Sequence, residues 1–165
     1  MAKITLGGNP VITSGDLPKI GTKAKDFELV AIDLSTKTLS DFLGSKLILN
    51  IFPSVNTGVC SASVRNFNER ASQLNNTKVL CISRDLPFSQ DQFCAAEGLK
   101  NVIMLSDFKT GAFGKNYGLM MTNGIFDALL SRCVIILDEQ GTVIYTEQVP
   151  EIGQEPNYEA ALNAL

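Results

Sequence analysis

The chain has 165 residues, of which 45% are hydrophobic and 19% are charged, and its formal net charge is −3. This length and balance predict a single globular domain over residues 1–165 with a sizeable core. The chain has no basic run, no apolar stretch long enough to span a membrane and no apolar signal-peptide core, so we expect a cytoplasmic protein that binds neither nucleic acid nor membranes.

The predicted strands are short and mostly apolar. The first two form an N-terminal hairpin over residues 3–15 that turns at Gly7-Gly8-Asn9-Pro10. Single strands are then predicted over residues 26–33, 47–52, 78–83 and 101–105. The last pair is a hairpin over residues 132–149 that turns at Glu139-Gln140-Gly141. Three of these runs, LILNIF, KVLCIS and NVIML, are apolar enough for a sheet that is covered on both faces.

Helical patterns lie between these strands. They are predicted for residues 38–44 (a short helix ended by glycine), 58 to 73 or 74, 88–99 (a weaker pattern that ends near Gly98) and 157–165. Parallel strands joined by helices and followed by an antiparallel pair predict an α/β fold: a three-layer α/β/α sandwich with an N-terminal β-hairpin.

Cysteine is the residue type that carries reactive chemistry in this chain. Four cysteines stand at positions 60, 81, 94 and 133, and there is no histidine. No pair has the C-x-x-C spacing of dithiol carriers and zinc knuckles, and the lack of histidine excludes the usual zinc site, the Ser-His-Asp triad and the Cys-His pair. We therefore expect no metal and no cofactor, and a reactive cysteine would depend on charge, helix dipoles and hydrogen bonds.

Cys60 lies in the first turn of the helix predicted after residue 57. Thr57 is the best N-cap residue, with Asn56 as an alternative, and Cys60 would then take the third helical position. Free backbone N–H groups and the positive end of the helix favour a thiolate there. Cys60 also shares the helix face of Val64, Phe67, Ala71 and Leu74, so an inert cysteine packed in the core is equally compatible with its position.

A family resemblance favours the reactive alternative. Residues 53–60, PSVNTGVC, resemble the peroxiredoxin active-site pattern P-x-x-x-T/S-x-x-C. The wider chain resembles the thiol peroxidases, which are atypical two-cysteine peroxiredoxins, in LGGNPV near the N-terminus, in Cys94 and in SRCVIILD with Arg132. This resemblance implies a thioredoxin-like fold and a homodimer.

The resemblance also implies a role for each matching residue. Cys60 would be the peroxidatic cysteine, whose thiolate attacks a hydroperoxide and becomes a sulfenic acid. Thr57 would hydrogen-bond the thiolate and the peroxide, Pro53 would shield the site from water, and Arg132 would supply positive charge that favours the thiolate. Cys94 would be the resolving cysteine, which closes an intramolecular disulfide with Cys60.

The implied substrates are alkyl or lipid hydroperoxides as well as hydrogen peroxide, and the implied reductant is thioredoxin. We interpret Cys81 and Cys133 as inert core residues because both lie inside predicted strands. Cys133 matches no family role and could form a side disulfide. We expect Arg65 to be solvated, since it points away from the Cys60 face.

Three alternatives use the same residues differently. A phosphatase or arsenate reductase needs C-x5-R, whereas Cys60 and Arg65 give C-x4-R, and Cys94 is followed at that spacing by Lys100. A one-cysteine peroxidase would leave Cys94 structural. A thioredoxin-like redox sensor or binding module would keep the fold without turning over peroxide.

Overall fold

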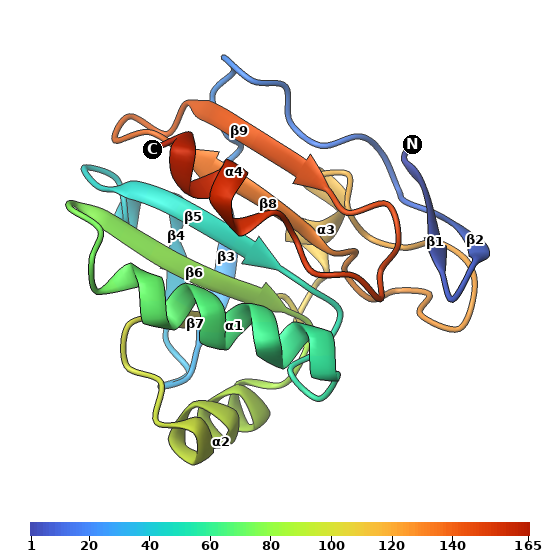
Figure 1. Ribbon diagram of the computed structural model, residues 1–165, viewed down its shortest axis with the longest axis horizontal. Coiled ribbons are helices and arrows are strands. Elements are labelled where there is room, and N and C mark those ends of the chain that lie inside the picture. The colour runs from blue at the N-terminus through green and yellow to red at the C-terminus, as the bar shows by residue number, and fades with distance from the viewer.

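The computed structural model describes residues 1–165, in which a mixed β-sheet lies between helices (Figure 1). The strands are β1 (Lys3–Leu6), β2 (Asn9–Ile12), β3 (Glu28–Ala31), β4 (Thr36–Thr38), β5 (Lys46–Ile51), β6 (Thr77–Ser83), β7 (Ile103–Ser106), β8 (Cys133–Leu137) and β9 (Val143–Gln148). The helices are the 3₁₀ turn η1 (Leu39–Asp41), α1 (Gly58–Ala71), α2 (Pro87–Glu97), α3 (Ala112–Asn116) and α4 (Tyr158–Asn163). None of them is long and apolar enough to cross a membrane.

The main sheet has seven strands in the order β4-β3-β7-β6-β5-β8-β9. Its centre is parallel, since β5 pairs with β6 and β6 pairs with β7 in that sense. β3 joins β7 antiparallel on one side, and the β8–β9 hairpin joins β5 antiparallel on the other. The predicted α/β sandwich is therefore confirmed, and the carboxyl ends of β5, β6 and β7 share one edge of the sheet.

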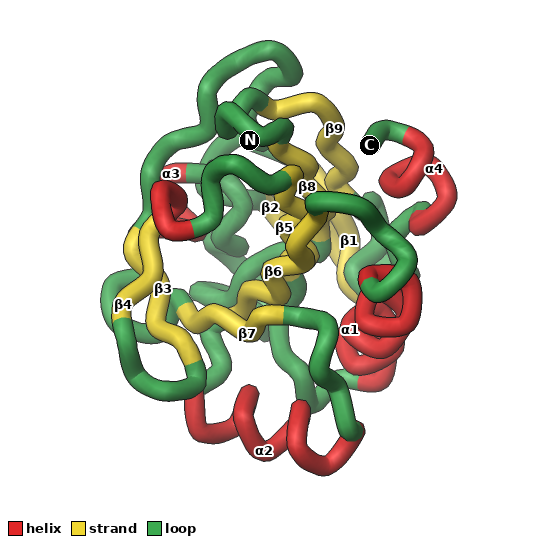
Figure 2. Tube along the Cα trace, turned by 90° about the vertical axis from the view of Figure 1, so that its left-hand side faces the viewer, coloured by secondary structure: helices red, strands yellow, loops and turns green.

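Alternation along the central strands divides the core into two layers. Leu47, Leu49 and Ile51 face the side that is covered by η1 and α3, whereas Ile48 and Phe52 face α1 and α4. Figure 2 shows α1 and α4 on one side of the sheet and α3 on the other. The predicted inward residues Cys60, Val64 and Phe67 of α1 are all fully buried on the α1 side.

The N-terminal hairpin forms as predicted, but it pairs as a separate two-stranded sheet. It is attached to the loop after β9 by backbone hydrogen bonds from Thr5 N–H to the Pro150 carbonyl and from Ile152 N–H to the Thr5 carbonyl. This attachment places the hairpin beside the loop that contacts Arg132, described below.

Two predictions of local structure differ from the structure. Residues 38–44 form only the 3₁₀ turn η1, because the strand β4 occupies Thr36–Thr38 and the Asp41 carboxylate folds back onto the Thr38 N–H. The short helix α3 was not predicted, since its five residues, AFGKN, are too few to show a helical period. α2 ends as expected at Gly98, whose φ of 65° is the left-handed conformation that favours glycine at a helix C-terminus.

Candidate active site

Cys60 lies where β5 gives way to α1, just beyond the edge of the sheet. The chain leaves β5 at Ile51, turns through residues 52–57 and enters α1 at Gly58, with Thr57 in the N-cap position. Cys60 is therefore the third helical residue, as predicted. Backbone N–H groups in this first turn have no partner within the helix, and the helix dipole adds positive potential near the sulfur.

Arg132, which directly precedes β8, contacts the sulfur of Cys60. Its guanidinium Nη2 donates to Cys60 Sγ over 3.1 Å, and its Nε donates to the Ile152 carbonyl over 2.7 Å. Arg132 is only 2% exposed, and its Nη1 is buried without a hydrogen-bond partner. A buried cation therefore touches the sulfur and retains an unused donor beside it.

Strand alternation explains why Arg132 reaches Cys60 and its neighbour Cys133 does not. Arg132 shares its strand face with Val134 and Ile136, which pack in the same layer as Cys60. Cys133 points to the other face and packs in the layer that is covered by η1 and α3. A side disulfide of Cys133 would not reach Cys60 in this arrangement, because the two side chains pack in opposite core layers.

Burial favours the thiol form of Cys81, Cys94 and Cys133. It raises the pKa of Cys81 to about 12, although a hydrogen bond from Asn50 acts in the other direction and the nearby Cys94 adds to the rise. Burial likewise raises the pKa of Cys133 to about 12 and that of Cys94 to about 11, with the Asp91 carboxylate adding to the rise at Cys94. All four cysteines are free.

Cys94 lies on α2 and packs, half-buried, against the same core layer as Cys60. Only Pro87 and Gln90 of α2 are buried, whereas α1 buries Cys60, Ser63, Val64 and Phe67, so α2 packs fewer of its side chains into the core. The weak helical pattern in the sequence corresponds to this shallow packing.

Comparisons with known proteins identify the family of the chain. The Redoxin family matches residues 19–162. Over 165 residues the chain is 51% identical to a thiol peroxidase of Corynebacterium glutamicum and 50% identical to one of Mycobacterium bovis, covering 100% of this chain and 99% of each relative. The chain belongs to the thiol peroxidases of the peroxiredoxin family.

Solved structures support the same assignment. A peroxiredoxin-like protein from Aquifex aeolicus superposes with a TM-score of 0.93 at 34% identity, covering 99% of this chain and 95% of that one. A thiol peroxidase from Chromobacterium violaceum, at 21% identity, shares the fold with a TM-score of 0.91, covering 98% of this chain and 93% of that one. The thioredoxin-like peroxiredoxin fold is thus confirmed, and this thiol peroxidase is a thiol-dependent peroxidase enzyme.

The remaining predicted site residues lie in the loop before α1. Pro53 is buried directly after Phe52. The Thr57 hydroxyl donates to the Ser54 carbonyl over 3.3 Å and makes no hydrogen bond with Cys60, and it does not cap the helix with its side chain. For Thr57 to donate a hydrogen bond to the sulfur or to a peroxide, its hydroxyl must rotate away from the Ser54 carbonyl. Arg65 is exposed, as predicted from its position away from the Cys60 face of the helix. Its Nη1 lies 3.6 Å from the Glu97 carboxylate.

Sequence reasoning missed two groups that hold this site of the thiol peroxidase in place. The first is the Ile152 carbonyl, which fixes Arg132 and which no side-chain pattern could have indicated. The second is Asp85, whose carboxylate binds the loop before α1. The sequence did contain a signal for Asp85, because Ser83 ends a buried parallel strand and the polar residues Arg84 and Asp85 follow it directly, and such strand ends meet at one edge of the sheet.

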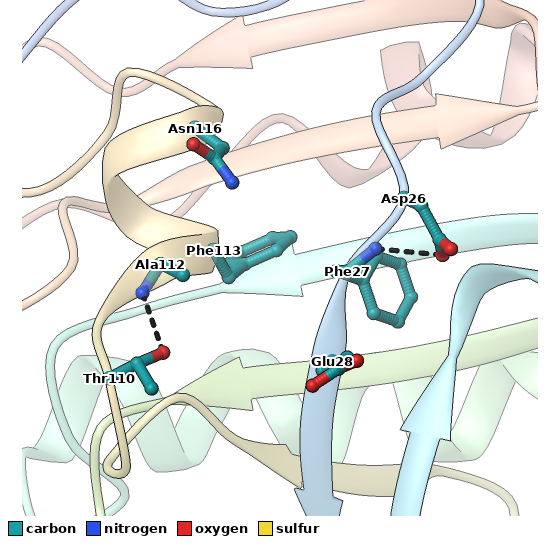
Figure 3. A pocket seen from close by; sticks show the side chains of 7 residues that line it. All are labelled: Asp26, Phe27, Glu28, Thr110, Ala112, Phe113 and Asn116. Carbon is teal, nitrogen blue, oxygen red and sulfur yellow. Dashed lines mark hydrogen bonds between the residues drawn. The ribbon is translucent and has the colours of Figure 1, made fainter.

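A cavity of about 350 Å³ lies away from the cysteines, between the start of β3 and α3 (Figure 3). Phe27 and Phe113 line it and pack edge to face at 5.8 Å in the core layer opposite Cys60. The carboxylates of Asp26 and Glu28 also line it. None of its seven lining residues is a cysteine.

Proposed function

We propose that this enzyme reduces hydroperoxides with Cys60 as the peroxidatic cysteine and Cys94 as the resolving cysteine. The observation that carries the proposal is the 3.1 Å contact between Arg132 Nη2 and Cys60 Sγ at the N-terminus of α1. A fixed cation and a helix terminus both stabilise negative charge on that sulfur, which is the form that attacks peroxides.

In the first step the Cys60 thiolate attacks one oxygen of the hydroperoxide. The O–O bond breaks, Cys60 is oxidised to a sulfenic acid, and the other oxygen leaves as an alcohol, or as water from hydrogen peroxide, after taking a proton. Negative charge moves from the sulfur to the leaving oxygen in this step. The unpartnered Nη1 of Arg132 can donate a hydrogen bond to that oxygen. Arg132 would therefore stabilise the negative charge first on the sulfur and then on the leaving oxygen.

In the second step the Cys94 thiolate attacks the Cys60 sulfur, an S–S bond forms, the S–O bond breaks, and the sulfenic oxygen leaves as hydroxide, which takes a proton from solvent to become water. A disulfide needs Cα atoms within about 7 Å, and Cys60 is fully buried in a helical turn. We therefore infer that the first turn of α1 and the segment around Cys94 unwind after oxidation. Exposure would also return the pKa of Cys94 from about 11 toward its ordinary value, which increases its thiolate fraction.

The remaining parts of the proposal concern partners and location. Thioredoxin would reduce the disulfide, the substrates would include alkyl or lipid hydroperoxides as well as hydrogen peroxide, and the protein would work as a cytoplasmic homodimer whose whole chain, residues 1–165, forms one unit. Thr57 and Pro53 would bind the peroxide and exclude water, respectively. These roles rest on the family's motif and on the position of both residues in the loop before Cys60.

A coupled assay tests the proposal most broadly. NADPH oxidation is followed with thioredoxin, its reductase and either cumene hydroperoxide or hydrogen peroxide. We expect turnover with the wild-type protein and none with Cys60→Ser at an unchanged circular dichroism spectrum. A one-cysteine peroxidase would keep turning over as Cys94→Ser, and a sensor would react once with peroxide without catalysis, so either result would overturn the two-cysteine proposal.

A further inference from the structure

Asp85 connects the loop before Cys60 to the segment that carries Cys94. Its Oδ1 accepts a hydrogen bond from the Ser54 hydroxyl over 2.7 Å, and its Oδ2 accepts one from the Val55 N–H over 2.9 Å. The Ser83 hydroxyl, at the end of β6, donates to Oδ2 over 2.6 Å. One half-buried carboxylate therefore joins the Cys60 loop to a strand end.

The same residue is anchored at the start of α2. Asp85 precedes Pro87, the first residue of α2, by two positions, and the Ser106 hydroxyl at the end of β7 donates to the Asp85 carbonyl. Gln90, fully buried on α2, donates through Nε2 to Ser83 Oγ over 3.1 Å and to the Leu105 carbonyl over 3.0 Å. A continuous chain of hydrogen bonds thus runs from the Cys60 loop through Asp85 to the first turns of α2.

The loop has no other attachment of this kind. The hydrogen bonds that link residues 53–57 to segments beyond the loop and α1 all end on the Asp85 carboxylate. The remaining bonds of the loop are local: Asn56 and Thr57 both donate to Ser54. Val55 is 2% exposed, so without the carboxylate its N–H would be buried and unpaired while the loop is closed.

We propose that Asp85 is a positioning residue that holds the Cys60 loop closed and makes it open together with α2. This inference rests on the proposed function, in which both segments must unwind before the disulfide can form. Its consequence is that the Asp85 hydrogen bonds set the rate of the second step, and hence how long the sulfenic acid of Cys60 remains open to attack by a second peroxide molecule.

The test compares Asp85→Ala, Asp85→Asn and the control Asp26→Ala. Asp26 also accepts hydrogen bonds from two backbone N–H groups, those of Phe27 and Leu39, but it lies beside the opposite core layer. Asparagine at position 85 can still accept from the Val55 N–H and can donate to the Ser54 hydroxyl, so it should restore most of the wild-type behaviour. Circular dichroism and thermal unfolding establish that each variant is folded.

The first measurement is hydrogen exchange of the reduced proteins, without peroxide. In Asp85→Ala, protection should fall by about tenfold or more in residues 53–57 and by the same factor in residues 84–90, because an unpaired buried N–H and a lost bond to a charged group disfavour the closed state. Asp85→Asn and Asp26→Ala should stay near the wild type in both segments. Loss of protection in only one segment would overturn the proposed coupling.

The second measurement separates the two chemical steps by acid quench and mass spectrometry after a pulse of cumene hydroperoxide. In Asp85→Ala, oxidation of Cys60 should stay within about threefold of the wild type, since the closed state is still the major one. Disulfide formation should be about tenfold faster, and sulfinic acid at Cys60 under excess peroxide should decrease accordingly. Slowing of both steps together, or an unchanged second step, would contradict the role of Asp85. Failure of the proposed function would show separately, as a wild-type protein that forms no Cys60–Cys94 disulfide.

Discussion

Arg132 Nη2 lies 3.1 Å from Cys60 Sγ, although the two residues are 72 positions apart in the chain. The contact depends on two unrelated parts of the fold: the start of β8, which points Arg132 toward α1, and the Ile152 carbonyl, which holds Nε at 2.7 Å. The cation is thus fixed before any peroxide arrives, and electrostatic stabilisation is most effective when donors need no reorganisation.

Replacing Arg132 should slow the first chemical step. Arg132→Met removes the cation and both Nη donors at similar side-chain length, and we expect oxidation of Cys60 to fall by about a hundredfold, the usual cost of losing a preorganised donor to a developing anion. Arg132→Lys should give an intermediate rate, since it keeps the charge without the planar fork. Rates come from quenched mixing with cumene hydroperoxide, and alkylation of Cys60 at pH 7 should slow in parallel. Wild-type rates in Arg132→Met would rule out this role.

Removing the Cys94 thiol, the proposed resolving thiol, should separate the first turnover from the later ones. Cys94→Ser should oxidise Cys60 once at the wild-type rate and then stall in the thioredoxin-coupled assay. Under excess peroxide its Cys60 should accumulate sulfinic acid, because no thiol captures the sulfenic acid. Intact-mass spectrometry follows the addition of each oxygen. Cys133→Ser is a matched control, since Cys133 lies on the other side of the sheet, and it should keep the disulfide and the turnover.

Raising the pH should loosen α2. Burial raises the pKa of Cys94 to about 11 in the folded helix, above its ordinary value of 9.0. The corresponding stabilisation is complete below pH 9 and is lost as the pH rises through 11, because the exposed thiol loses its proton first. Hydrogen exchange of residues 88–97, corrected for the intrinsic exchange rate, should show growing local opening from pH 8 to 10.5. In Cys94→Ala the local opening of α2 should not grow with pH in this way. If opening increases equally with pH in the wild type and in Cys94→Ala, the pH dependence does not come from Cys94.

Lowering the pH should release the N-terminal hairpin. Hydrogen bonds from the Thr5 hydroxyl and from the N–H groups of Gly7, Gly153 and Gly8 lower the pKa of Glu151 from 4.5 to about 2. Since the folded pKa is depressed, this stabilisation is present above pH 4.5 and disappears as the pH falls toward 2. Glu151→Gln should therefore lose less stability than the wild type between pH 4.5 and 2, measured by urea unfolding at each pH. If Glu151→Gln loses more free energy of unfolding than the wild type over this pH range, the predicted stabilising effect of ionised Glu151 is wrong.

Most of the fold followed from hydrophobic patterns in the sequence. The central strands are nearly continuous apolar runs, and the inward face of α1 has helical spacing, so both were predicted with their burial. The misses are short segments: β4 and η1 together span 36–41, and α3 has five residues. Segments of this length are fixed by tertiary contacts, such as the bond from the Thr38 N–H to Asp41, rather than by a periodic pattern.

Only part of the site could be predicted from the sequence. The position of Cys60 in the first turn of α1 could be predicted from capping rules, whereas the roles proposed for Cys94 and Arg132 depended on family resemblance. The contact between Arg132 and Cys60 needs the register of β8 against β5, in which Ile51 pairs with Cys133, and no local pattern specifies this register. The Asp85 hydrogen bonds are likewise tertiary, joining loops about 30 residues apart.

Peptide mapping of the protein after one equivalent of cumene hydroperoxide tests the central claim most directly. The reduced protein is oxidised, its remaining thiols are alkylated, and the digest is analysed without reductant. The proposed mechanism predicts one disulfide that joins the Cys60 and Cys94 peptides, with Cys81 and Cys133 alkylated. A disulfide from Cys60 to Cys81 or Cys133, or an alkylated Cys60 after the peroxide has been consumed, would contradict it.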